Sequence, residues 1–95
     1  MGFYSEHDDE MEDILYSVKC ERIRQEELKK HGEFEFTCAD AAMPLATKLA
    51  VLVEEVGEVA RALCDDESVD RLRDELVQVA AVSVAWIQAL DKQEC

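Results

Sequence analysis

The chain has 95 residues, 48% of them hydrophobic, and its 23 acidic and 10 basic side chains give a formal charge of −13. This length predicts one domain over residues 1–95, and the charge argues against binding to nucleic acid or to an anionic membrane surface. A phosphate-bearing substrate is not excluded, because divalent cations reverse the local field of a carboxylate cluster. High solubility is the simpler explanation of the same charge.

The cysteine pattern and the N-terminus predict a cytoplasmic protein with reduced thiols. No C-x-x-C pair or zinc-type spacing is formed by the four cysteines, which are Cys20, Cys38, Cys64 and Cys95. The first residues are acidic and lack the apolar run of a signal peptide. The apolar run over 76–90 is too short and too interrupted by polar side chains to span a bilayer.

The first predicted helix covers about residues 8–30, where Met11, Ile14 and Val18 follow a 3.6-residue period. Gly32, after a basic pair, is a typical end signal for this helix. Residues 33–42 break the pattern. They are predicted to form a loop that packs on the core through Phe34 and Phe36.

The second predicted helix begins near Pro44, which suits a first-turn position, and ends in the polar stretch CDDES. Its apolar stripe consists of Leu45, Leu49, Leu52, Val56, Val59, Ala60 and Leu63.

The third predicted helix follows Ser68, a favourable N-cap, and runs to about Leu90. From Leu76 onward it is apolar nearly all round, which predicts burial on more than one side. The expected fold is therefore all-α, a bundle of about three main helices per chain, completed by oligomerisation.

Acidic side chains interrupt the two apolar helices in a regular way. Glu55 and Glu58 are three residues apart on the second helix, as are Glu75 and Gln78 on the third, so each pair shares a helix face. Antiparallel packing would bring the pairs together, with Glu54 beside them. Hard oxygen ligands of this kind suit Mg²⁺, with Mn²⁺ as an alternative.

Purely structural explanations carry about equal weight. The acids of the second helix could be a solvated face that pairs with Lys48 and Arg61, and Glu75 could pair with Arg71 one turn earlier. Gln78 could be a buried hydrogen-bonding residue between helices. A ferritin-like di-iron site is disfavoured, because it needs two Glu-x-x-His pairs and the chain has none.

The motif EEVGE at residues 54–58, followed by DELVQ at residues 74–78, resembles the MazG-like nucleoside triphosphate pyrophosphohydrolases of the all-α NTP pyrophosphatase group. Their pattern is E-E-x-x-E, a spacer, and then E-x-x-D. The likeness covers about residues 44–90. It implies an α-helical homodimer or homotetramer that hydrolyses an NTP or dNTP to the monophosphate and pyrophosphate.

The resemblance also implies roles for individual residues. Glu55, Glu58 and Glu75 match the family's metal ligands, and Glu54 matches the acid that positions or deprotonates the attacking water. Gln78 departs from the pattern, because it offers a neutral oxygen where the motif has Asp, which weakens Mg²⁺ binding. The alternative is therefore a catalytically degenerate helical dimer that acts as an interaction module. Candidate contacts to the substrate are Lys48, Arg61, Arg71, Arg22 and Gln25.

Overall fold

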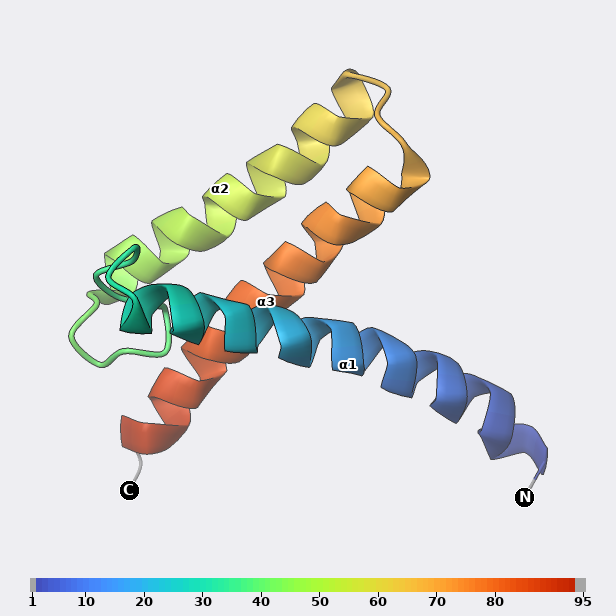
Figure 1. Cartoon of the computed structure of the whole chain (residues 1–95), viewed down its shortest axis with the longest axis horizontal. Helices are drawn as coiled ribbons and strands as arrows, with labels where there is room; N and C mark the ends of the chain where they lie inside the picture. Colours follow the sequence, from blue (N-terminus) through green and yellow to red (C-terminus); the bar gives the residue numbers. More distant parts are fainter. Residues whose placement is uncertain (1, 94–95) are drawn as a thin grey trace.

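Three helices make up the chain in the computed structural model, which describes the backbone of residues 2–93 and the side chains of residues 8–93. They are α1 (Gly2–Lys30), α2 (Leu45–Cys64) and α3 (Val69–Gln93), and the described residues contain no strand, which confirms the all-α prediction. Figure 1 shows α2 and α3 side by side in opposite directions, with α1 crossing α3. The backbones of α1 and α2 stay apart within the described part, so α3 is the helix that both others pack against.

The helix ends follow the predicted signals. Gly32 has φ +83°, and its N–H donates to the Lys29 carbonyl, while the Glu33 N–H reaches the Leu28 carbonyl. Glycine adopts this conformation at little cost, so it ends α1. The Ser68 hydroxyl accepts a hydrogen bond from the N–H of Arg71 at 3.1 Å, as expected of an N-cap. Because no breaker interrupts the sequence, α1 begins earlier and α3 ends later than predicted.

The loop between α1 and α2 is anchored differently from the prediction. Phe34 and Phe36 are each 42% exposed, whereas Thr37, Cys38 and Ala39 are buried. The prediction that the two phenylalanines pack the loop on the core is therefore wrong. The physical reason is that a buried loop backbone needs hydrogen-bond donors for its carbonyls, which an aromatic ring cannot supply.

Lys48 supplies those donors from α2. Its side chain is 2% exposed, and Nζ donates to the carbonyl oxygens of Cys38 at 2.7 Å and Asp40 at 2.6 Å. On the other side of the loop, Lys29 of α1 forms an ion pair with the carboxylate of Asp40. Two lysines from different helices thus hold one short stretch of loop.

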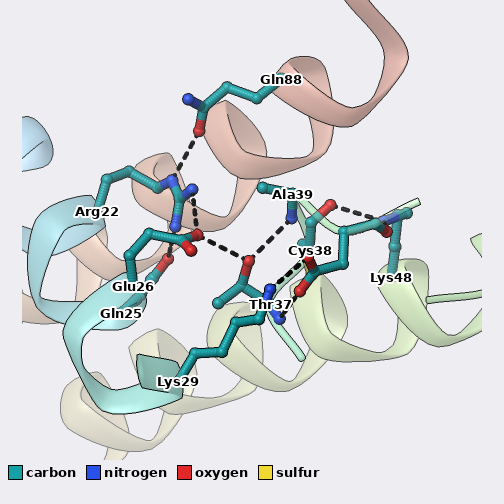
Figure 2. Close-up of polar contacts among 10 residues, drawn as sticks. Arg22, Gln25, Glu26, Lys29, Thr37, Cys38, Ala39, Lys48 and Gln88 are labelled. Carbon is teal, nitrogen blue, oxygen red and sulfur yellow. Dashed lines mark hydrogen bonds and ion pairs between the residues drawn. The ribbon is translucent and has the colours of Figure 1, made fainter. Parts of the chain in front are cut away.

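A second group of buried polar contacts links α1 to the loop and to α3 (Figure 2). Arg22 donates to the side-chain oxygens of Gln25, Glu26 and Gln88, each within 2.9 Å. Thr37 donates its hydroxyl to the same Glu26 carboxylate. Burial acts to raise the pKa of Glu26, but the hydrogen bonds from Arg22 and Thr37 outweigh it and lower that pKa.

Small side chains fill the interior, and large apolar side chains lie outside. Ala81, Ala85 and Ala89, four residues apart on α3, are almost fully buried. Of the predicted apolar stripe of α2, Leu52 packs against the core, but the buried side chains of this helix are Lys48 and Ala62. Glu55 lies on the same inner line as these two residues. Large exposed apolar side chains include Met11, Ile14, Leu15, Leu45, Leu49, Val56, Leu63, Leu76, Ile87 and Leu90.

The shape of the chain agrees with this open arrangement. Its radius of gyration is 15.1 Å, against about 12 Å for a compact domain of this length. All side chains over residues 8–16 of α1 are exposed, although Ile14 and Tyr16 of this part line hollows that it shares with α3 in the described chain. No helix of the described residues is both long and apolar enough to cross a membrane.

A substitution of Lys48 tests whether its two hydrogen bonds hold the loop between α1 and α2. We expect Lys48→Met to lower the free energy of unfolding by about 2–3 kcal/mol, because two buried carbonyls lose a charged donor. Urea denaturation measures this loss, and amide hydrogen exchange at residues 37–43 reports whether the loop opens. Lys19→Met, at an exposed position of α1, is the control. Equal stability of the two variants would contradict the assignment.

Candidate functional site

Glu55 is the charge on the inner line of α2 that forms no hydrogen bond or ion pair within the described residues, although Arg24 of α1 attracts it through space. Lys48, two turns earlier on the same line, is satisfied by loop carbonyls. Glu55 is half-buried, and its side chain makes no hydrogen bond or ion pair with any described residue. Its pKa is raised, first by burial and then by the carboxylates of Glu75, Glu58, Glu54 and Glu21. Acidic side chains from three helices therefore surround one half-buried carboxyl group.

Glu75 of α3 is buried and has a partner of its own. Its Oε1 lies 3.0 Å from Nη2 of Arg71, one turn earlier on the same helix. The structural explanation considered for Glu75 is thus observed. The partner is partial compensation, because Arg71 is also 3.7 Å from Glu67 and half of its side chain is exposed.

Glu21 and Arg24 on α1 are the site residues that the sequence reasoning missed. Arg24 holds both oxygens of Glu21, at 2.9 Å and 2.8 Å, and this pair lies near Glu55. The available signal was the polar series Ser17, Glu21 and Arg24, which repeats at four and three residues along one face of α1. Arg22 and Gln25, which were predicted instead, lie on the neighbouring face of α1.

Three hollows surround these carboxylates. The first, about 540 Å³, lies between α1 and α3 and contains Glu21, Arg24, Glu75 and Gln78 in its lining. The second, about 160 Å³, shares Arg24 and Gln78 with the first and adds Glu55. A third, about 440 Å³, lies on the flank of α2 along Glu54, Glu55, Gly57, Glu58 and Arg61. Glu55 thus borders two of the three.

Some of the predicted substrate contacts line these hollows, and others are buried in contacts that hold the fold together. Gln25 lines the second hollow, Arg61 the third and Arg71 the first. Arg22 and Lys48 are buried, and their side chains are hydrogen-bonded in the contacts that hold α1, α3 and the loop between α1 and α2 together. We therefore do not include them among the proposed substrate contacts.

The donor set fits a hard divalent cation by its chemistry, although it is not preassembled. Burial, and then the repulsion of the neighbouring carboxylates, raises the pKa of Glu55. Carboxylate oxygens are the ligands that Mg²⁺ and Mn²⁺ prefer. Within the described residues, no three His, Cys, Asp or Glu side chains lie close enough to hold a metal ion. Two of the carboxylates, Glu21 and Glu75, are turned to arginines instead.

No family model, curated protein or solved structure matches the chain. The resemblance carried by EEVGE and DELVQ therefore rests on those two short motifs and on their occurrence on helices α2 and α3, which pack together. The function has to follow from the carboxylates and the hollows beside them.

The raised pKa of Glu55 predicts a pH-dependent cost to the fold. A carboxyl group with a raised pKa in the folded state contributes stability below its ordinary pKa and loses it as the pH rises through the raised value. We therefore expect Glu55→Gln, in metal-free buffer, to melt at a higher temperature than the parent chain at pH 7.5. The difference should shrink as the pH falls toward about 4, where the unfolded carboxyl is protonated.

Differential scanning calorimetry between pH 4 and pH 8 measures this difference. Glu12→Gln, at an exposed position of α1, removes the same charge outside the cluster and should give a smaller gain. Identical melting temperatures for the parent chain and Glu55→Gln at pH 7.5 would argue against charge crowding at Glu55.

Proposed function

We propose that the chain is a divalent-metal-dependent pyrophosphohydrolase, which hydrolyses an NTP or dNTP to the monophosphate and pyrophosphate. The observation that carries this proposal is Glu55, a half-buried carboxyl group without a partner among the described residues and with four other carboxylates around it. A chain keeps such a costly arrangement where a ligand compensates it. A divalent cation bound to phosphate oxygens is a ligand of that kind.

Glu55, Glu58 and Glu75 would hold the cation, and Gln78 would add a neutral oxygen. A cation held there would neutralise charge on the phosphate oxygens and lower the pKa of a bound water. Glu54, which borders the same hollow as Glu58, is exposed and free to accept a proton from that water. Arg61, in the lining of this hollow, is placed to donate to a phosphate oxygen.

The second hollow supports a nucleotide as the substrate. Phe34 and Phe36 line it from the loop, and Gln25 lines it from α1. The two rings are partly exposed, which suits stacking on a base better than packing in a core. Oε1 of Gln25 accepts from Arg22, so its amide N–H₂ is the part left to donate to a base carbonyl. Glu55 borders the same hollow, so a base held there lies next to the carboxylates.

An interaction module without catalysis is the second candidate function. Two observations favour it: Arg71 already compensates Glu75, and Gln78 lacks the charge that the motif calls for. Neither observation accounts for Glu55. The hydrolase is therefore the better supported function.

We also propose that the working form is a homodimer or homotetramer. Leu45, Leu49, Val56 and Leu63 form one exposed face of α2, which we call the outer face. A contiguous apolar face of this kind marks an interface. Glu54, Glu58 and Arg61 lie on the opposite flank of the helix, so a second copy can cover the outer face and leave the acids open.

A nucleotide panel tests the hydrolase. We expect the chain with Mg²⁺ to release pyrophosphate from at least one NTP or dNTP, measured with an enzyme-coupled phosphate assay. Glu55→Gln and Glu58→Gln should each lower kcat/KM by more than about 100-fold, since each removes a charged metal ligand. The helical circular dichroism spectrum should stay intact in both. Glu12→Gln is the charge-matched control, and wild-type rates in both site variants would refute the metal assignment.

Sedimentation velocity at low micromolar concentration tests the assembly. We expect a dimer or larger species for the parent chain. Leu49→Lys, on the outer face, should shift the population toward monomer, because it places a charge in a buried apolar contact. Glu54→Lys, on the opposite flank of the same helix, should leave the assembly intact. A stable, folded monomer of the parent chain would contradict the proposal.

A further inference from the structure

The hollow between α1 and α3 brings arginines together in a strongly acidic chain. Its lining contains Arg24, Arg71 and Arg73, which are three of the chain's five arginines. The carboxylates of Glu21, Asp74 and Glu75 lie in the same lining, so arginines and acids are equal in number there. Ser17 contributes a hydroxyl to the same lining.

The three arginines differ in their partners. Arg24 holds Glu21 through two hydrogen bonds, and Arg71 lies 3.0 Å from Glu75. Arg73 donates to the hydroxyl of Ser17 at 3.2 Å and pairs with no described carboxylate. All three residues are exposed, so their guanidinium groups can be reached from solvent.

We propose that this hollow, which we call the arginine pocket, binds the polyphosphate end of the substrate and the pyrophosphate product. The inference rests on the proposed hydrolase function and adds to it the place of the β and γ phosphates. Planar guanidinium forks match phosphate oxygens in geometry and charge. The pocket shares Arg24 and Gln78 with the hollow that Glu55 borders, so a triphosphate can extend from one to the other.

The ion pairs of Arg24 and Arg71 link phosphate binding in this pocket to cation binding nearby. In the structure, Arg24 and Arg71 act as counter-ions for Glu21 and Glu75, two of the carboxylates that surround Glu55. When Glu75 turns to a divalent cation, Arg71 loses this partner, keeps only the longer contact with Glu67, and becomes available to bind phosphate. This exchange of an arginine partner for a cation explains why the described carboxylates form no metal cluster before the cation binds. It also makes cation binding and phosphate binding favour each other.

Two binding measurements test the pocket and the exchange separately. Free Mn²⁺ counted by electron paramagnetic resonance gives the affinity for the cation alone. Calorimetric titration with inorganic pyrophosphate at saturating Mg²⁺ gives the affinity for the phosphate end. We expect Arg71→Gln to tighten Mn²⁺ binding several-fold, because Glu75 loses its competing partner, and to weaken pyrophosphate binding by about tenfold.

Arg73→Gln separates the two effects. Since Arg73 holds no carboxylate, this variant should keep the Mn²⁺ affinity within about twofold and still weaken pyrophosphate binding by about tenfold. Lys19→Gln, on α1 outside the pocket lining, should change neither affinity. Circular dichroism confirms that each variant is folded.

The outcomes distinguish this inference from the proposed function. Parental pyrophosphate affinity in both arginine variants would overturn the pocket, whether or not the chain hydrolyses nucleotides. Weaker Mn²⁺ binding by Arg71→Gln would overturn the exchange. If the variants behave as expected and no nucleotide is hydrolysed, the polyphosphate site stands and the hydrolase proposal fails.

Discussion

The buried ammonium of Lys48 fixes the loop that joins α1 to α2. The backbones of α1 and α2 stay apart, so this loop and the packing of α1 on α3 together position α1. That loop has no regular structure, and Lys48 satisfies two of its buried carbonyls from α2. Arg22 and Glu26 fix its other side from α1. Glu21 and Arg24 are brought near Glu55 by the packing of α1 on α3, and these loop contacts add to that packing.

The two charged residues on the inner line of α2 have opposite effects on the stability of the fold. Lys48 is buried with two carbonyl partners and stabilises the fold. Glu55, seven residues later, is half-buried among carboxylates and costs the fold stability above its raised pKa. A residue that costs stability in a helix so well supported elsewhere is typical of a binding site. Glu55 therefore indicates a binding site more strongly than Glu75, which is paired with Arg71.

Sequence patterns predicted the three helices, the end of α1 and the start of α3, because Gly32 and Ser68 act locally on the backbone. They did not predict which way the apolar face of α2 points. Periodicity reveals a stripe of apolar residues, but the same stripe can face the core or a partner. The ion pair of Glu75 with Arg71 followed from spacing along one helix. The contribution of Glu21 and Arg24 did not, because it depends on where α1 crosses α3.

The division of α2 into two flanks links assembly to chemistry. Leu49 and Val56 lie on the outer face, and Glu54 and Glu58 lie on the opposite flank, with Glu55 between them on the inner line. The buried apolar side chains are small, whereas large apolar side chains are exposed and charge is crowded around Glu55. Burial of the outer face by a second copy would supply apolar stabilisation and leave the acidic flank open. Under the proposed function, oligomerisation would then stabilise a fold in which carboxylates crowd around Glu55.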